Sequence, residues 1–350
     1  MSKDITLGIL YSGQLETQLV KSAKKIGKIK TIILTDDKNG PAQHFCDKFI
    51  YGNLKDKELI KDFIEQVDIC TYAFENLSYE IVKSISAKKE VHPSPDTLRI
   101  AQNRILEKKF ANDLRIKTTD WKTVNSLMDL KEGIQLYGNC IMKSVSGGYD
   151  GKQQFRFKSI DDIDSKIDFK KEYILERFLN FKQEISVAAT RYKSGKISMY
   201  EPTENKHENG ILRNSKIPAN ISKKIFNQAQ EITVKFAEKL KYIGTLNLEF
   251  MVDEKDDLFF NEYANRCHNG FWHSVNSYKI CQFTNHIRAV CGLDYIENKK
   301  ISNAEMLNIL GDEILKFREK KFKQNEFFFD YLKKEIRPGR KMGHITTLKD

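Results

Sequence analysis

Two glutamates late in the chain stand where a metal site could form. Glu249 and Glu262 belong to two short runs, residues 246–252 and 258–264, on either side of a charged turn at 253–257. In the first run apolar residues alternate with polar or smaller ones, which is the period-two pattern of a half-buried strand. We therefore expect a β-hairpin that carries one carboxylate on each strand.

If the hairpin is symmetric about Lys255 and Asp256, Glu249 lies directly opposite Glu262. Side chains paired in this way have Cβ atoms about 5 Å apart, so two like charges repel unless they share a cation. Two carboxylates beside the amide of Asn261 are oxygen ligands that suit magnesium carrying a nucleotide phosphate. Taken alone, such a segment is more commonly an edge hairpin with solvated glutamates.

Three polar residues just after the second run favour the functional interpretation. Arg266, His268 and Asn269 lie within four positions, directly beyond the run that carries Glu262. Arginine presents a planar fork to a planar, carboxylate-like anion, and histidine and asparagine can donate hydrogen bonds from the sides. An anion bound there would lie beside the metal site.

A glycine-rich loop in the middle of the chain could cradle phosphates. Residues 146–152 read SGGYDGK, and Lys143 precedes them at the end of an apolar run. Glycine lets backbone amides approach phosphate oxygens, and a lysine nearby adds a point charge. Most glycine-rich loops are only turns, so this signal is weak by itself.

A short apolar patch further on could bind a purine. Phe178 and Leu179 lie between Glu176 and Glu184, which suits a base held near a carboxylate that reaches the ribose. Either glutamate could equally be a solvated surface residue.

Composition and charge bound the possible functions. The chain has 350 residues, 40% hydrophobic and 31% charged, which is typical of a globular protein with two or three domains. The formal net charge is +11, from 59 basic and 48 acidic residues. Because the lysines are spread along the chain without a nucleic-acid-binding motif, we expect no nucleic-acid partner. A phosphate-bearing substrate or a lysine-biased genome accounts for the excess.

Cysteine usage and hydropathy indicate the compartment. None of the six cysteines forms a C-x-x-C pair, so we expect reduced thiols rather than a zinc or redox site. No apolar run approaches the length of a membrane span, and the start of the chain lacks a signal-peptide core. We therefore expect a cytoplasmic protein without a membrane partner.

The elements that position these residues follow from hydrophobic periodicity. Apolar runs at 5–11, 31–34 and 67–72 alternate with helical patterns, which predicts a doubly wound parallel sheet within a first domain, residues 1–95. Gly13, Asp36 and Glu75 follow the three runs, where open α/β sheets bind ligands.

The rest of the chain divides into a larger and a smaller part. We expect a second domain over 96–300, with a flap of short strands over about 115–180, and a small C-terminal unit over 301–350. Asp96 is the expected cap of the first helix of the second domain. A longer helix over about 221–241 has one apolar stripe and leads into the hairpin.

Several stretches, in order along nearly the whole chain, resemble the 5-(carboxyamino)imidazole ribonucleotide synthetases, a family of ATP-grasp ligases in purine biosynthesis. They are Gln102-Asn103-Arg104 with Lys108, Gly147 to Lys152, Glu204-Asn205-Lys206-His207, Asn261-Glu262, Arg266-Cys267-His268-Asn269, Gln282-Phe283 with His286 and Arg288-Ala289, and Arg340-Lys341-Met342-Gly343-His344. Each stretch is modest alone, but together they are specific.

The resemblance implies an α/β (α+β) protein with an ATP-grasp fold, an N-terminal doubly wound parallel-sheet domain and a small C-terminal unit. It also implies ATP-dependent carboxylation of 5-aminoimidazole ribonucleotide with bicarbonate, through carboxyphosphate, with Mg2+ as the metal and a cytoplasmic homodimer as the assembly. Two alternatives stay open: another ATP-grasp ligase that acts on a phosphorylated small molecule, and a non-catalytic nucleotide-binding protein.

The resemblance further implies roles for matching residues. Those implied for ATP are Arg104, Lys143, Gly148, Tyr149, Asp150, Gly151, Lys152, Gln153, Glu176, Arg177, Phe178, Leu179, Glu184, His207, Asn261 and Glu262. The implied magnesium ligands are Glu249 and Glu262, and the implied catalytic residues are Arg266, His268, Asn269, Asp150 and Tyr149. Gln14, Glu75, Lys333 and Arg340 are implied to contact the ribonucleotide substrate.

Departures from the family pattern concentrate at the first glycine loop. The family usually has glycines before Gln14, where this chain has Tyr11 and Ser12, and Glu16 follows Leu15. Further on, Gln153 and Leu332 stand where the family has glycine, and Gly270 stands where it has serine. These changes bear on substrate geometry, whereas the residues implied for ATP and magnesium are all present.

Overall fold

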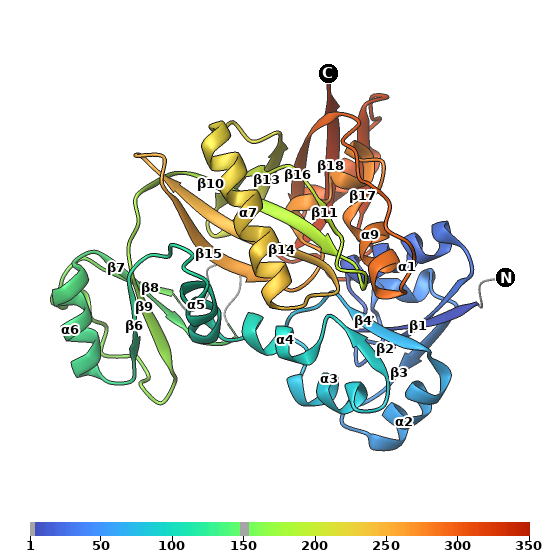
Figure 1. Cartoon of the computed structure of the whole chain (residues 1–350), viewed down its shortest axis with the longest axis horizontal. Coiled ribbons are helices and arrows are strands. Elements are labelled where there is room, and N and C mark those ends of the chain that lie inside the picture. Colours follow the sequence, from blue (N-terminus) through green and yellow to red (C-terminus); the bar gives the residue numbers. More distant parts are fainter. Residues whose placement is uncertain (1–3, 148–153) are drawn as a thin grey trace.

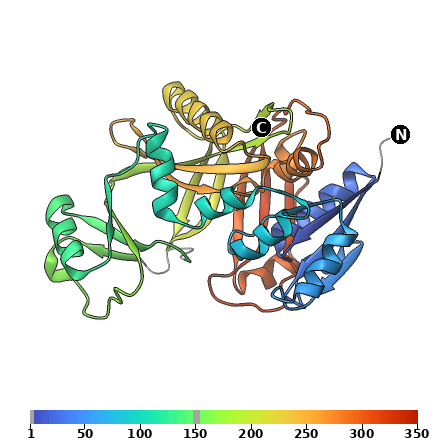
Figure 2. The same ribbon diagram turned by 60° about the horizontal axis from the view of Figure 1, so that its bottom comes forward.

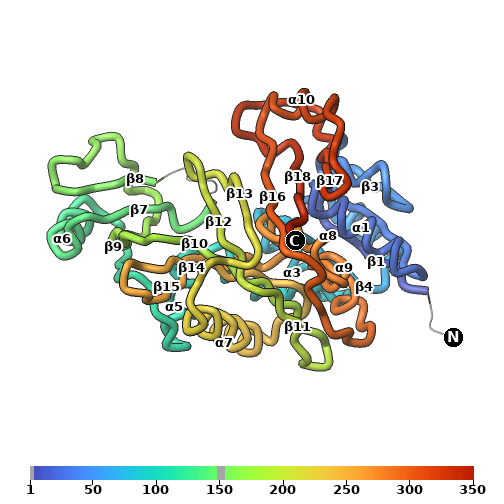
Figure 3. Tube along the Cα trace, turned by 90° about the horizontal axis from the view of Figure 1, so that it is seen from above, coloured from blue at the N-terminus to red at the C-terminus, as the bar shows by residue number. Residues whose placement is uncertain are grey.

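The computed structural model describes residues 4–147 and 154–350, which form three β-sheets with helices packed against them (Figure 1). The N-terminal sheet and the small sheet that contains β6 to β9 lie at opposite ends of the molecule, with the largest sheet between them (Figures 1 and 3). In the described part of the chain, no helix is long and apolar enough to cross a membrane.

The N-terminal sheet is parallel, as its alternation of strands and helices predicts. Its strand order is β3-β2-β1-β4-β5, with bounds β1 Ile5–Leu10, β2 Ile29–Thr35, β3 Lys48–Tyr51, β4 Ile69–Tyr72 and β5 Glu90–His92. The helices between these strands are α1 Gln14–Ile26, α2 Lys57–Gln66 and α3 Tyr79–Ser86. This confirms the doubly wound sheet, to which the structure adds the short strands β3 and β5.

The two helices after this sheet correct one expectation. Ser94, not Asp96, occupies the cap position of α4 Pro95–Ala101, and proline at the first helical position has the dihedral angle that a helix needs. The helical pattern then breaks, and Asn103 caps a separate helix, α5 Arg104–Asp113, by accepting hydrogen bonds from the amides of Ile105 and Leu106.

A small antiparallel sheet forms the lobe that surrounds the glycine-rich loop. Its strand order is β6-β9-β7-β8, with bounds β6 Trp121–Val124, β7 Cys140–Ser144, β8 Gln154–Phe157 and β9 Tyr173–Arg177, and helix α6 Leu127–Tyr137 packs against it. Strands β7 and β8 bracket residues 148–153, which lie outside the described part.

The largest sheet has nine strands and holds the carboxylate hairpin at one edge. Its order is β15-β14-β10-β12-β13-β16-β18-β17, with β11 paired to β10. The strands near the hairpin are β10 Phe181–Arg191, β11 Ile197–Met199, β12 Thr203–Glu208, β13 Ile211–Ile217, β14 Gly244–Asp253 and β15 Leu258–Ala264. Helix α7 Lys223–Lys239 packs on it with Phe236 stacked on Phe260, which buries the apolar stripe expected over 221–241.

The C-terminal residues extend this same sheet instead of forming a separate one. Strands β16 Asn303–Leu310, β17 Glu326–Asp330 and β18 Lys341–Lys349 continue it beyond β13, and α10 Glu313–Glu319 packs on them (Figure 3). On the other side, α1 packs against α9 Gln282–Val290, so the N-terminal sheet shares a core with the end of the chain (Figure 2).

Candidate functional site

A cavity of about 1270 Å³ opens among the three sheets and gathers most of the predicted site. The predicted residues that line it are Glu75, Arg104, Lys143, Glu176, Arg177, Phe178, Leu179, Glu184, His207, Glu249, Asn261, Glu262, Arg266, His268 and Asn269. They come from segments up to two hundred positions apart, so their convergence is a property of the fold.

The hairpin pairs the two glutamates as expected, but its strand register differs from the expected one. Near the turn, Phe250 pairs with Phe260, a register centred on Lys255 alone. The register then shifts, so that Glu249 pairs with Glu262. The extra residue is Asn261, and a β-bulge of this kind redirects the side chains around it. The pairing is confirmed, whereas the simple symmetry assumed from the sequence is wrong.

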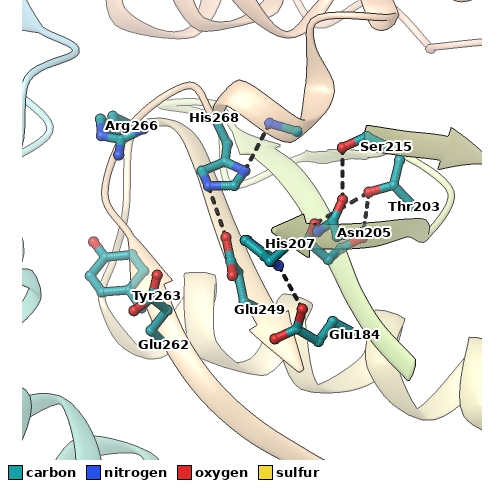
Figure 4. Close-up of polar contacts among 12 residues, drawn as sticks. Glu184, Thr203, Asn205, His207, Ser215, Glu249, Glu262, Tyr263, Arg266 and His268 are labelled. Carbon is teal, nitrogen blue, oxygen red and sulfur yellow. Dashed lines mark hydrogen bonds and ion pairs between the residues drawn. The ribbon is translucent and has the colours of Figure 1, made fainter. Parts of the chain in front are cut away.

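Glu249 has a histidine partner inside the cavity. His268 Nε2 lies 2.9 Å from Glu249 Oε1, and both side chains are largely buried (Figure 4). Burial raises the pKa of the Glu249 carboxyl, but His268, with smaller contributions from His207 and Arg266, outweighs burial and holds that pKa well below its usual range. Glu249 is therefore a charged carboxylate at neutral pH, which is the form that binds a cation.

A second carboxylate–histidine pair lies on the neighbouring strands. His207 Nδ1 lies 2.5 Å from Glu184 Oε2, across the β10–β12 pair (Figure 4). Burial lowers the pKa of His207, but the Glu184 carboxylate outweighs burial and raises the pKa of His207 overall. Asn205, behind this pair, is held by Ser186 and Ser215.

Arg104 reaches the hairpin from the start of α5. Its Nη1 lies 3.4 Å from Glu262 Oε2. Because Asn103 caps the helix immediately before it, the position of Arg104 is set by the first turn. The two residues that the resemblance implies for phosphate and metal thus lie together.

A buried charge cluster joins the small sheet to α5. Glu176 on β9 lies 2.9 Å from Lys143 Nζ on β7 and 3.2 Å from Lys108 Nζ on α5, and Thr119 donates to the same carboxylate. Burial opposes the charge, but the two lysines outweigh it and hold the pKa of the Glu176 carboxyl far below its usual range. Lys108 also donates to the Asn261 carbonyl, at 3.0 Å.

Lys108 is a buried residue beside this site to which the sequence assigned no role. It is 1% exposed, although it lies in a helical segment where lysine is usually solvated. The only signal was its place in the stretch that resembles the family. Lys108 links the bulge of the hairpin to the wall that carries Glu176.

Arg266 faces the N-terminal domain. Its Nε and Nη2 donate to Glu75 Oε2 at 2.9 and 2.6 Å, and Figure 4 places it apart from Glu249 and His268. Asn269, by contrast, is 8% exposed, lines the cavity, and has neither amide atom hydrogen-bonded to another described residue. The three residues predicted to bind an anion thus share the cavity, but Arg266 and His268 contact different carboxylates.

Three predicted substrate contacts do not line this cavity. Gln14 lies at the start of α1, Lys333 donates to the Lys341 carbonyl at 2.7 Å, and Arg340 donates to the Glu335 carbonyl at 2.9 Å. Lys341, beside Arg340, does line it. The predicted contacts Gly148, Tyr149, Asp150, Gly151, Lys152 and Gln153 lie outside the described residues.

Comparison with known proteins matches each part of the chain to a family model. A ribonucleotide synthetase preATP-grasp domain matches residues 4–102, an ATP-grasp domain matches 109–283, and a phosphoribosylaminoimidazole carboxylase C-terminal domain matches 304–350. The first match covers the N-terminal sheet, the second covers the small sheet and the hairpin, and the third covers the C-terminal strands β16 to β18.

Relatives that match over nearly their full length point to the same family as these models. The N5-carboxyaminoimidazole ribonucleotide synthase of Brucella melitensis is 36% identical, over 98% of this chain and 96% of that protein. The synthase of the same name from Bacillus subtilis is 34% identical, over 100% and 94%. The crystal structure of the Staphylococcus aureus N5-carboxyaminoimidazole synthetase complexed with ADP superposes with a TM-score of 0.93 at 29% identity, over 100% of this chain and 94% of that one. This chain belongs to the N5-carboxyaminoimidazole ribonucleotide synthase family of ATP-grasp ligases.

Proposed function

We propose that this chain carries out the reaction for which its family is named: ATP-dependent carboxylation of 5-aminoimidazole ribonucleotide with bicarbonate in purine biosynthesis. The observation that carries the proposal is the cavity itself, in which the paired carboxylates Glu249 and Glu262 lie near the cationic residues Lys143 and Arg104. ATP phosphorylates bicarbonate to carboxyphosphate and leaves as ADP. The substrate amine then attacks the carboxyl carbon, so that a C–N bond forms, phosphate leaves and the amine loses a proton.

The nucleotide fits along the small sheet. Lys143 and Arg104 line the cavity there and are assigned to phosphate oxygens, and the apolar wall of Phe178 and Leu179 suits the base. Arg177, Glu176, Glu184 and His207 complete the proposed ATP contacts. Gly148 to Gln153, between β7 and β8, are proposed to cover the phosphates, and excluding water there would protect carboxyphosphate from hydrolysis.

Glu249, Glu262 and Asn261 fit magnesium that arrives with ATP. The described residues hold no cluster of three or more His, Cys, Asp or Glu side chains that could bind a metal alone. Magnesium in nucleotide sites takes only one or two carboxylates and completes its shell with phosphate oxygens and water, which agrees with this pair. When bound, it would neutralise charge on the phosphates during transfer.

Bicarbonate and the ribonucleotide are assigned to the opposite wall. We assign bicarbonate to Arg266, His268 and Asn269, because Asn269 offers an amide without a described hydrogen-bond partner and all three residues line the same cavity. Gln14, Glu75, Lys333 and Arg340, together with Tyr149 and Asp150, are assigned to the ribonucleotide. Asp150 is our candidate to orient or deprotonate the attacking amine.

Phosphate release from ATP, measured with bicarbonate and 5-aminoimidazole ribonucleotide present or withheld in turn, tests the proposal. We expect turnover that requires both. Turnover with a different carboxylate or amine would favour another ATP-grasp ligase, and nucleotide binding without turnover would favour a non-catalytic protein.

The assembly and location belong to the proposal as well. We propose a homodimer, because the family resemblance implies that assembly. We propose a cytoplasmic location, because the six cysteines include no pair spaced for a metal or redox motif and are expected to be reduced thiols. Sedimentation equilibrium of the purified chain tests the dimer directly, and a monomeric mass across the working concentration range would exclude it.

A further inference from the structure

The first loop, where this chain departs from its family, makes a contact that its sequence did not reveal. Tyr11 stacks on Phe74, with ring centroids 3.9 Å apart and planes 14° from parallel. Tyr11 does so with φ at 76°, a backbone conformation that suits glycine. Such a conformation persists in a tyrosine only where surrounding contacts fix it, and here its amide also donates to the Leu34 carbonyl at 2.8 Å.

Glu16 also connects the loop before α1 to the loop after β4. It is 2% exposed, and its carboxylate accepts hydrogen bonds from the Gly13 amide at 2.9 Å and from the Ala73 amide at 3.1 Å. Gly13 is hemmed in as well, because a Cβ there would lie 2.9 Å from Glu16 Oε2 and 3.2 Å from the Tyr11 ring. The start of α1 and the loop after β4 are thus joined by a ring stack and by a buried carboxylate.

The loop that these contacts hold carries Glu75. Ala73, held by Glu16, lies two positions before Glu75, whose carbonyl accepts from Gln102 Nε2 at 2.7 Å. The Glu75 carboxylate in turn receives Nε and Nη2 of Arg266. A displacement of the loop would therefore move both Glu75 and Arg266 at the cavity wall.

We propose that Tyr11 and Glu16 are positioning residues, which lock the loop after β4 onto the start of α1 and so fix Glu75, which Arg266 holds at the wall assigned to the ribonucleotide substrate. This inference rests on the proposed function. The lock supports the wall assigned to the ribonucleotide, whereas the proposed ATP contacts come mainly from the small sheet, α5 and strands β10, β12 and β15, so its loss affects the two substrates unequally. Small misplacements of groups that orient a substrate are costly even far from the reacting atoms.

The test is steady-state phosphate release by the full chain at pH 8, with each substrate varied while the others are saturating. We expect Tyr11→Ala and Glu16→Gln each to raise the KM for 5-aminoimidazole ribonucleotide about tenfold, the loss expected for one or two buried hydrogen bonds. The KM for ATP should change less than about twofold by the same conversion. Glutamine keeps the shape of Glu16 but turns an NH2 group toward one of the two amides.

Two matched controls separate positioning from general damage. Tyr11→Phe keeps the ring stack and should behave as the parent does. Glu58→Gln removes a largely exposed glutamate of α2, whose partner Lys61 is also largely exposed, and should change neither KM. If Tyr11→Ala fails to fold by circular dichroism, Phe74→Leu removes the stack from the other side without touching the strained residue.

The outcomes are distinct. Equal rises in both KM values, or no change in either with the fold intact, would overturn the positioning role alone. A parent protein that does not respond to the ribonucleotide would overturn the proposed function and this inference with it.

Discussion

At the scale of single residues, three acidic side chains of the cavity wall each have a basic partner. Glu249 lies against His268, Glu184 against His207 and Glu262 against Arg104. A cation that binds Glu249 must therefore compete with His268 for this carboxylate.

The metal pair can be tested by one change that keeps side-chain size. We expect Glu262→Gln to lower ATP turnover by at least about 100-fold, because it removes one of two anionic ligands from a centre that stabilises charge in the transition state. Glu254→Gln, on the exposed turn of the same hairpin, is the matched control. Near-normal turnover by a folded Glu262→Gln variant would contradict the metal assignment.

Arg266→Ala tests the anion site. We expect it to keep ATP binding and to lose bicarbonate-dependent phosphate release, at a cost of about 3 kcal/mol or more, as for other donors to developing charge. The measurement is phosphate release against bicarbonate concentration, with ATP and the ribonucleotide saturating. An unchanged bicarbonate response in the variant would move the anion site elsewhere.

Glu16 gives a pH dependence of stability. Burial raises the pKa of its carboxyl to about 7, from 4.5. The folded state therefore binds more protons than the unfolded state between these values, so this residue's stabilising contribution is complete below pH 4.5 and is lost as pH rises to 7. We expect a loss of up to about 3 kcal/mol across that window. Urea unfolding at several pH values should show this slope in the parent and a flatter one in Glu16→Gln.

At the scale of elements, the sequence predicted the strands and helices whose hydrophobic pattern can be recognised within a short segment. The period-two alternation placed β14 and β15, and the charged turn paired Glu249 with Glu262. It could not reveal the bulge at Asn261, because an inserted residue leaves the alternation on each side intact. Strand β5 was missed because three residues carry too little periodicity, and β3 was missed because that strand, unlike the fully buried β4 of the same length, has no buried apolar run.

Contacts between elements far apart in the chain could not be predicted from the sequence, for a different reason. Lys108 has the sequence of an ordinary helical lysine, and its burial depends on β9 and β15 being brought to it. The ion pair of Arg266 with Glu75 crosses between domains and has no local signature. Residue types therefore indicated which side chains belong to the site, while their partners followed only from the fold.

The lysine of α5 allows a matched test of element packing. We expect Lys108→Met to lower the free energy of unfolding by about 3 kcal/mol, because it leaves Glu176 with one cation fewer in a buried place. Lys109→Met, its exposed neighbour on the same helix, should change stability by less than about 0.5 kcal/mol. Urea denaturation measures both. Equal stability of the two variants would show that Lys108 contributes nothing to this packing.

At the scale of the whole molecule, the nine-stranded sheet joins the hairpin to the C-terminal residues. Glu249 and Glu262, the proposed magnesium ligands, belong to this sheet together with β18, which begins just after Arg340, while Lys143 and Glu176 belong to a separate sheet. The proposed magnesium ligands and the proposed phosphate contact Lys143 therefore come from different sheets.

The continuous sheet also decides whether the end of the chain can be treated as a detachable module. Removing residues 301–350 would strip β16 from β13 and leave Ile211–Ile217 as an open edge beside the uncovered Ile217 and Phe271. Exposed apolar edges recruit strands from other molecules. We expect the truncated chain to collect in the insoluble fraction or as soluble aggregates on size-exclusion chromatography, whereas a stable monodisperse product would show that the sheet tolerates the cut. Residues 304–350 match a family model of their own, but they complete a sheet that begins in the preceding domain. The chain should therefore be expressed and engineered whole.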